Sequence, residues 1–268
     1  MSKPHYNRIL LTGASGNLGE QLRLGLKGQS PFLRMSDIAP LRAPPLAAHE
    51  EFVHCNLSNK AEVIALAKDC DAIVHFGGIS TEHSFEEVLE ANIKGVFHIY
   101  EGARIHKVKR VIFASSNHAI GFHPQGEVID TDCLQRPDSY YGLSKAYGEN
   151  LSRFYFDRYG IESVCLRIGS CFPEPIDRRM LITWLSFSDL NELVTNCLNA
   201  DKVEHSIVYG ASNNRDKWWD NSKVAHLGYH PKDTSEAFRA AREATPALPE
   251  SDPAKKFQGG GYTKMGPF

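Results

Sequence analysis

A chain of 268 residues with 42% hydrophobic and 23% charged side chains can bury a substantial core, which excludes a disordered, collagen-like or disulfide-scaffold protein. Thirty Lys and Arg residues against 32 Asp and Glu residues give a net charge of −2, so no global positive field would hold nucleic acid or an anionic membrane. We therefore expect the partner to be a small molecule.

The cysteines and the N-terminal apolar run indicate the cellular compartment in which we expect the protein. The cysteines have no C-x-x-C pair and no zinc-ligand spacing, which favours reduced thiols over bridges. They are Cys55, Cys70, Cys133, Cys165, Cys171 and Cys197. The apolar run Ile9–Leu11 stops at Thr12, far short of a signal-peptide core or a membrane span. We expect a soluble protein of the cytoplasm.

Short apolar or β-branched runs alternate with longer amphipathic ones over the first 115 residues, which is typical of a parallel sheet wrapped by helices. The expected strands are Arg8–Thr12, Phe32–Asp37, Glu51–Cys55, Ala72–Phe76 and Arg110–Ser115. The expected helices are Leu18–Lys27, Lys60–Lys68 and Ser84–Lys107. The proline-rich segment Pro40–Ala48 is expected to be a surface loop.

The pattern continues to about Gly169 and then breaks into proline-containing loops. The later expected elements are a helix over Tyr140–Tyr159, a strand over Glu162–Arg167, a helix around Asp189–Leu198, a strand at Ser206–Tyr209 and a tail from Pro246. We predict an α/β fold with a doubly wound parallel sheet of the Rossmann type. Residues 1–170 would be the nucleotide-binding domain, and residues 171–268 a small substrate-binding annex and tail packed on it.

The first expected strand runs into glycines spaced G-x-x-G-x-x-G, and a helix follows. Gly13 would permit the tight turn, Gly16 would let the backbone approach a pyrophosphate, and Gly19 would let the helix pack closely. The helix N-terminus would offer amides to the anion. Such a triplet alone is as often a simple tight turn, but the strand before it and the helix after it favour a dinucleotide site.

Asp37 ends the second expected strand, eighteen residues after Gly19. Its carboxylate would accept hydrogen bonds from the ribose hydroxyls and would repel a 2′-phosphate, which favours NAD. Arg34 and Arg42 are near enough in sequence to keep NADP open as an alternative. Asp37 could also be only a turn former before Pro40.

Tyr141 and Lys145 are four residues apart on one expected helix, so their side chains share a face. A phenol of pKa about 10 is a poor base at neutral pH, but an adjacent ammonium stabilises the phenolate. Ser116 follows an expected strand end, 25 residues before Tyr141, at the sheet edge where ligands bind. A surface Tyr/Lys pair is the alternative, and this position argues against it.

These elements resemble the extended short-chain dehydrogenase/reductase superfamily over Arg8–Cys171. The resemblance also includes His75-Phe76-Gly77-Gly78 after the fourth strand and Asn92 in the next helix. The resemblance implies that Ser116 polarises the substrate oxygen, Tyr141 is the general base, and Lys145 tunes Tyr141 and holds the nicotinamide ribose. It implies that Asn92 supports a proton relay through water. Asn56 stands where the superfamily usually has an Asp facing the adenine amine, and an Asn carbonyl can still accept that bond.

Several less common sequence motifs are similar to those of the uronate dehydrogenase family. They are Phe113–His118, Arg167–Cys171 with Pro173-Glu174-Pro175, Arg179–Leu181 followed by Trp184, Trp218–Asn221 and Phe257–Gly260. The resemblance implies oxidation of C1 of pyranose glucuronate or galacturonate with NAD, giving an aldarolactone. It ranks neither sugar above the other.

The expected cofactor is NAD, the expected substrate is a uronic acid, and no metal is expected. The expected NAD-binding residues are Gly13, Ser15, Gly16, Asn17, Leu18, Gly19, Asp37, Asn56, Leu57, Phe76, Gly77, Gly78, Ser115, Tyr141, Lys145, Ile168 and Cys171. The expected substrate-binding residues are Ser80, Ser116, Asn117, His118, Tyr141, Ser170 and Arg179. The resemblance alone places Ser170 among the substrate-binding residues and Cys171 among the NAD-binding residues.

Two of these assignments carry alternatives. A guanidinium in Arg178-Arg179 would bind a carboxylate bidentately, and the resemblance points to Arg179, although adjacent arginines are more often a solvated turn. His118 would bind a sugar hydroxyl, or would instead be a structural cap or a second base. His226 and His230 are a poor metal pair because Gly228 lies between them and Pro231 follows.

Two rival functions stay open on the sequence. A nucleotide-sugar epimerase or dehydratase would share the glycine loop and the Tyr/Lys pair, but the 97 residues after Cys171 favour a monosaccharide. A non-catalytic dinucleotide sensor would not need Ser116, Tyr141 and Lys145 together. We also expect a homo-oligomer, since two long helices of this fold commonly build a dimer interface.

Overall fold

The computed structural model describes residues 6–42 and 44–266. A seven-stranded parallel sheet forms its centre, in the order β10-β7-β5-β4-β1-β2-β3. Its strands are β1 (Arg8–Thr12), β2 (Phe32–Asp37), β3 (Glu50–His54), β4 (Ala72–His75), β5 (Arg110–Ser116), β7 (Glu162–Ile168) and β10 (His205–Gly210). The predicted doubly wound α/β fold is confirmed.

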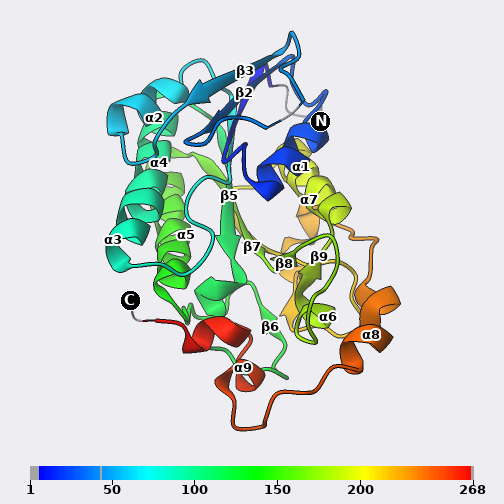
Figure 1. The fold of residues 1–268 in the computed structure, drawn as a ribbon. Helices are drawn as coiled ribbons and strands as arrows, with labels where there is room; N and C mark the ends of the chain where they lie inside the picture. The colour runs from blue at the N-terminus through cyan, green and yellow to red at the C-terminus, as the bar shows by residue number, and fades with distance from the viewer. Residues whose placement is uncertain (1–5, 43, 267–268) are drawn as a thin grey trace.

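Helices cover both faces of the sheet (Figure 1). On one face lie α1 (Asn17–Gly25) and α7 (Phe187–Asn199), and Leu22 and Leu193 pack with Leu166 of the sheet. On the other face lie α2 (Lys60–Leu66), α4 (Gly95–His106) and α5 (Tyr140–Tyr159). Ile99 and Tyr155 pack there with Val111. The alternating faces of the buried strands thus fill two apolar layers.

The expected helix over Ser84–Lys107 is wrong as a single α-helix. It consists of α3 (Phe85–Val88), a π-helical stretch (Leu89–Lys94) and α4. The π-helical stretch carries Asn92, whose amide pairs with the backbone of Ile79. A one-turn widening of this kind has no signal in hydrophobic periodicity.

Most other predicted elements agree with the observed bounds within one or two residues. The structure also has several short elements that had no signal in the sequence. The strands are β6 (Ile129–Asp130), β8 (Ser170–Cys171), β9 (Trp184–Leu185) and β11 (Trp219–Asp220). The helices are α6 (Met180–Thr183), α8 (Arg239–Glu243) and α9 (Pro253–Lys256), with 3-10 turns at Asn117–Ile120, Ser222–Leu227, Ser235–Phe238 and Gly260–Lys264. The expected loop Pro40–Ala48 has neither helix nor strand in its described residues, and position 43 lies outside them.

The segment 171–268 does not form a separate body. It supplies α7 to one helical layer and β10 to the edge of the main sheet, so a division at residue 170 runs through a single sheet. Its last part returns to the region below α5 (Figure 1), where Gln258 N donates to His123 O at 2.8 Å. The C-terminal residues therefore lie beside elements that are more than one hundred positions earlier.

Three further facts bear on the predictions. All six cysteines are free. Across residues 6–42 and 44–266, no helix is both long and apolar enough to cross a membrane. Over the same ranges, no three His, Cys, Asp or Glu side chains gather as a possible metal site.

Candidate active site

The strand ends of the parallel sheet define the site. The strand order runs outward in opposite directions from β1 and β4, and the carboxyl edge at such a switch point is where open parallel sheets bind their ligands. The loop after β1 carries the glycines, and β5 ends at Ser116. The predicted cofactor and catalytic residues thus come from neighbouring strand ends.

The glycine loop has the geometry of an anion-binding turn. Gly13 has a φ of +74°, and a Cβ there would lie 2.5 Å from Phe76 O. A Cβ at Gly19 would lie 2.0 Å from Gly13 O, so Gly19 lets α1 pack against the loop. Gly16 and Asn17 are exposed at the start of α1, where no side chain caps the helix. Its first amides are therefore free to bind an anion.

Asp37 lies beside this loop at the end of β2. Its Oδ2 accepts from Ser15 N at 3.0 Å and its Oδ1 accepts from Ala39 N at 3.0 Å. The second bond is the turn-forming geometry that was the alternative for Asp37. Both oxygens retain a lone pair for a ribose hydroxyl.

The two arginines that kept NADP open are engaged elsewhere. Arg34 pairs with Glu51 at 2.7 Å and donates to the carbonyl oxygens of Leu66 and Lys68. Arg42 is largely exposed and lies 3.6 Å from Glu20. Asp37 is thus the charged group that contacts the loop directly.

The segment after β4 lies beside the glycine loop at this edge of the sheet. Gly77 N donates to Thr12 Oγ1 at 3.3 Å, and Phe76 packs partly buried against the core. Gly78 has a φ of +126°, and a Cβ there would lie 2.6 Å from Asn92 Oδ1. Ser80 is exposed at the end of this segment.

Asn56 departs from its expected contact. Its Oδ1 already accepts from both Ser58 N and Ser58 Oγ, each at 3.0 Å. The carbonyl lone pairs are therefore used, so the prediction that they accept from the adenine amine lacks a free acceptor here. Leu57, next to it, packs partly buried against the second apolar layer.

Ser116, Tyr141 and Lys145 come together at the end of β5 and on one face of α5. Burial raises the pKa of the Tyr141 phenol, and the nearby Ser116 hydroxyl lowers it by a smaller amount. Lys145 Nζ lies 5.4 Å from the centroid of the Tyr141 ring and donates to Ala114 O at 2.8 Å. Burial lowers the pKa of Lys145 to about 8.

The α5 N-terminus is fixed from two sides. Ser139 Oγ accepts from Gly142 N at 3.0 Å, and the Glu82 carboxylate accepts from Tyr140 N and Tyr141 N at 3.0 and 2.7 Å. A carboxylate at free helix amides is favourable electrostatically. Glu82 therefore holds the backbone of Tyr141 in place.

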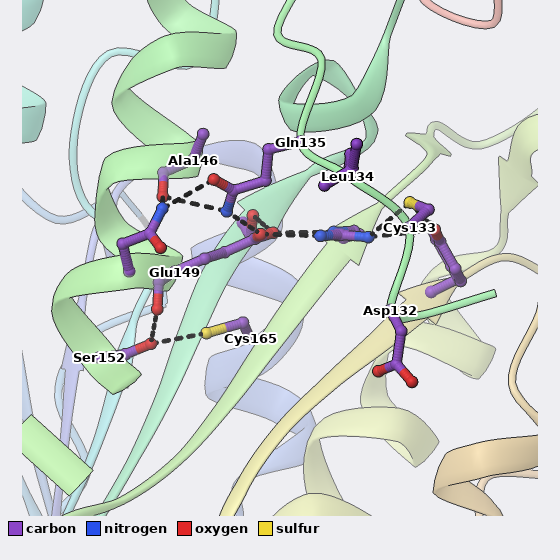
Figure 2. A network of polar contacts seen from close by, with 12 residues as sticks. Asp132, Cys133, Leu134, Gln135, Ala146, Glu149, Ser152 and Cys165 are labelled. Carbon is purple, nitrogen blue, oxygen red and sulfur yellow. Dashed lines mark hydrogen bonds and ion pairs between the residues drawn. The ribbon is translucent and has the colours of Figure 1, made fainter. Parts of the chain in front are cut away.

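Figure 2 shows a buried polar network around Glu149 of α5. Ser115 belongs to this network through its hydroxyl. Glu149 of α5 and Arg167 of β7 form a bidentate pair, with both N···O distances 2.9 Å and each side chain 1% exposed. Glu149 also accepts from Ser115 Oγ at 2.6 Å and from Gln135 Nε2 at 2.8 Å. The Ser115 hydroxyl is therefore committed to Glu149 and is directed away from the expected cofactor side.

Asn92 forms no hydrogen bond with Tyr141 or Lys145. Its Oδ1 accepts from Ile79 N at 2.8 Å, and its Nδ2 donates to Ile79 O and Ser144 Oγ at 3.0 Å each. The amide joins the segment after β4 to α5. The relay through water stays a prediction, with one Asn92 lone pair left to serve it.

Arg179 is a half-buried cation near the catalytic residues. Its Nε donates to Gln258 O at 2.6 Å, and its Nη1 donates to Ser170 Oγ at 3.3 Å. With its amide oxygen toward the guanidinium, Asn117 accepts from Arg179 Nη2 at 2.6 Å and donates to Ile168 O. Burial lowers the pKa of Arg179, Asp177 and Asp138 oppose this with smaller effects, and no carboxylate of the described residues forms an ion pair with it. The guanidinium is therefore contacted by neutral oxygens alone.

Arg178 is different from its neighbour. It is exposed, and its Nη2 donates to the carbonyl oxygens of Glu243 and Thr245 at the end of α8.

Cys171, in β8, has its pKa raised by burial. Ser170 Oγ lies 2.9 Å from Thr183 Oγ1. Ser170 of β8 and Asn117, at the start of the 3-10 turn after β5, thus both contact the Arg179 guanidinium.

His118 contacts residues that sequence reasoning missed. Its ring stacks on Tyr262 with a centroid distance of 3.7 Å, and its Nδ1 lies 2.7 Å from Asp138 Oδ2. The Tyr141 and Tyr262 rings lie 6.1 Å apart. Tyr262, Asp138 and Glu82 belong to no motif, and Gln258 lies in Phe257–Gly260 without a role predicted for it. Only the return of the C-terminal segment brings Tyr262 and Gln258 here.

Comparisons with known proteins match these features. Residues 9–186 match the NAD dependent epimerase/dehydratase family. The chain is 59% identical over 268 residues to a uronate dehydrogenase from Pseudomonas putida, covering 100% of both chains. A solved glucuronic acid dehydrogenase from Chromohalobacter salexigens is similar with a TM-score of 0.94 and 45% identity, covering 97% of this chain and 98% of that one. A uronate dehydrogenase from Agrobacterium tumefaciens, solved as a tyrosine-to-alanine mutant complexed with NAD, is similar with a TM-score of 0.93, 45% identity and 98% coverage of both chains.

Proposed function

We propose that this chain, which belongs to the NAD dependent epimerase/dehydratase family and to the uronate dehydrogenases within it, oxidises C1 of a hexuronic acid with NAD as the acceptor. The resemblance of the sequence motifs to the uronate dehydrogenase family is thereby confirmed. Glucuronate and galacturonate are the proposed substrates, and the aldarolactone is the proposed product.

The observation that carries the substrate class is the guanidinium of Arg179, which contacts neutral oxygens but no carboxylate. A half-buried cation that contacts no carboxylate is costly, and a bidentate carboxylate is its best partner. Asn117, which holds this guanidinium, directly follows Ser116 in the chain. A sugar carboxylate on Arg179 would therefore place the rest of the ring toward the catalytic residues.

The residues at the carboxyl edge of the sheet fit NAD. The free amides at the start of α1 suit a pyrophosphate, and the lone pairs of Asp37 suit the ribose hydroxyls without suiting a 2′-phosphate. Bound NAD supplies the hydride acceptor. In the proposal, Lys145 and Tyr141 contact it on the α5 side, and Ile168 and Cys171 on the side of β7 and β8.

The proposed proton path ends at Tyr141. Its phenolate oxygen takes the proton of the C1 hydroxyl while the C1–H bond breaks with its electron pair, and Ser116 donates to the oxygen that becomes a carbonyl. The Lys145 ammonium stabilises the phenolate. Because the ring oxygen stays attached to C1, the product is a lactone.

Three further proposals concern the whole chain. Residues 1–170 hold the cofactor and catalytic groups, and residues 171–268 supply the substrate side through Arg179 and Tyr262. A homo-oligomer is supported by the exposed apolar side chains Leu143, Phe154 and Tyr159 of α5. A cytoplasmic location is supported by six free thiols.

The direct test is an NADH absorbance assay with wild-type protein and a panel of free sugars. Glucuronate and galacturonate should reduce NAD, whereas glucose, galactose and nucleotide sugars should react weakly. Preferred oxidation of a neutral or nucleotide-linked sugar would overturn the substrate assignment and favour the rival enzyme class.

A further inference from the structure

His118 and Asp138 form a buried pair at the substrate side of the site. His118 Nδ1 and Asp138 Oδ2 are 2.7 Å apart, and the Asp138 side chain is 0% exposed. The His118 ring stacks on Tyr262, and the centroid of the Tyr141 ring is 5.8 Å away in an edge-on arrangement. The pair is therefore adjacent to the proposed base but is not part of the proton path.

The Asp138 carboxylate is fixed in place by three separate segments. A Cβ on Gly121 or Gly259 would lie 1.8 Å from Asp138 Oδ2, and a Cβ on Gly142 would lie 3.1 Å from Oδ1. Ser139 Oγ donates to Asp138 Oδ1 at 2.8 Å. Among the described residues no lysine or arginine pairs with this carboxylate, so His118 is its principal polar partner. Burying a carboxylate this way is expensive and calls for a role.

The pairing determines which nitrogen of His118 carries a proton. An ionised carboxylate only accepts hydrogen bonds, so Nδ1 must be the donor. Burial lowers the pKa of His118, although Asp138 opposes this effect, and the ring stays neutral. In the neutral ring Nε2 then carries a lone pair. No described residue hydrogen-bonds Nε2, which leaves this acceptor for a ligand.

We propose that Asp138 is a positioning residue that holds His118 in the Nδ1–H tautomer, so that Nε2 accepts a hydrogen bond from a hydroxyl of the bound uronate. The inference rests on the proposed function for the identity of the sugar, and on geometry alone for the tautomer. Stacking on Tyr262 fixes the plane of the ring, and Asp138 fixes its rotation and its proton. Arg179 would then bind the carboxylate end of the sugar and His118 a hydroxyl.

The tautomer is tested without turnover by ¹⁵N NMR of histidine-labelled wild-type protein without ligand. The account predicts a His118 signal with protonated Nδ1 and unprotonated Nε2. Assignment uses His118→Ala, in which that signal disappears. A His118 with protonated Nε2 in the wild type would overturn the proposal whether or not the protein oxidises uronates.

The coupling is tested by a double-mutant cycle of Asp138→Ala and His118→Ala. Each single variant should raise the KM for glucuronate by roughly 5- to 150-fold, the range for one hydrogen bond left unmade, while the Kd for NAD stays within about twofold. The value of kcat should change much less, because the proton path through Tyr141 is intact. The double variant should be no worse than His118→Ala.

Two further variants are controls for this test. Asp138→Asn keeps the volume and loses the charge, so it replaces Asp138→Ala if the latter does not fold, and it too should add nothing to His118→Ala. Asp130→Asn, at an exposed carboxylate paired with Lys223, should leave every constant unchanged. Additive effects of Asp138 and His118 variants, or a loss confined to kcat, would contradict the positioning role and favour a purely structural carboxylate or a second base.

Discussion

Ser115 and Ser116 are adjacent on β5, yet their hydroxyls lie on opposite sides of the sheet. Ser115 Oγ donates to Glu149 Oε1 at 2.6 Å in the buried network, whereas Ser116 Oγ accepts from His118 N at 3.1 Å beside Tyr141. Alternation along a strand requires this separation. Ser115 therefore joins β5 to α5, and we expect Ser116 to be the serine that serves the reaction.

The two serines should consequently respond differently to removal of the hydroxyl. Ser116→Ala should lower kcat by roughly 10²–10³-fold, the cost of one donor to a developing oxyanion. Ser115→Ala should cost about 1 kcal/mol of the free energy of unfolding and change kcat far less. Steady-state kinetics and urea unfolding of both variants measure this, and equal losses of kcat would contradict it.

Tyr141→Phe should reduce turnover by roughly 10²–10⁴-fold, because the variant lacks the group that accepts the proton. Its Kd for NAD should stay close to that of the wild type. Tyr140→Phe is the control, since the neighbouring ring packs edge-on against Phe85. Turnover like the wild type in Tyr141→Phe would show that another group is the base.

Asp37 should determine the choice between NAD and NADP. Asp37→Asn keeps an acceptor for Ser15 N but removes the charge that repels a 2′-phosphate. A hydrogen bond to a charged acceptor is worth roughly 1.5–3 kcal/mol, so the preference for NAD should narrow by about tenfold or more. The ratio of kcat/KM for the two cofactors measures the effect. Equal use of both by the wild type would remove Asp37 from this role.

Lys145 should make the stability of the ligand-free protein depend on pH. Burial lowers the pKa of its ammonium to about 8 in the folded chain, against an ordinary value of 10.5. Between these values the unfolded chain binds a proton that the folded chain has lost, so the free energy of unfolding rises with pH. At about 1.36 kcal/mol per pKa unit, the wild type should gain roughly 3 kcal/mol relative to Lys145→Met between about pH 7 and pH 10.5.

Urea unfolding of the two proteins across that range tests the effect. Because other titrating groups are common to both, the difference between them isolates Lys145. A difference that does not change with pH would mean that Lys145 is not buried as described.

The parts of the site that the sequence predicted are those fixed by local spacing. Gly13, Gly16 and Gly19 form one turn, and Tyr141 and Lys145 share one helical face because four residues make about one turn. The position of Ser116 could be predicted because the end of its strand could be recognised in the sequence. In each case the structural relationship spans a few residues or a single parallel strand edge.

The parts that could not be predicted depend on contacts far apart in the chain. Arg179 Nε donates to Gln258 O, and Tyr262 stacks on His118, only because the C-terminal segment returns beneath α5. The π-helical turn that directs Asn92 toward Ile79 has no periodic signal. Ser115 and Ser116 could not be separated until the partner of Ser115, Glu149, was placed.

The most direct test of the account is the ratio of kcat/KM for glucuronate to that for glucose in the wild type, Arg179→Ala and Arg178→Ala. Removing one partner of a buried charge pair costs roughly 2–5 kcal/mol, which at 1.36 kcal/mol per tenfold is about 30-fold to several-thousand-fold. The ratio should collapse by that factor in Arg179→Ala and stay near the wild-type value in Arg178→Ala, whose guanidinium binds only carbonyl oxygens at the surface. A ratio that is unchanged in Arg179→Ala would contradict recognition of the sugar carboxylate by Arg179.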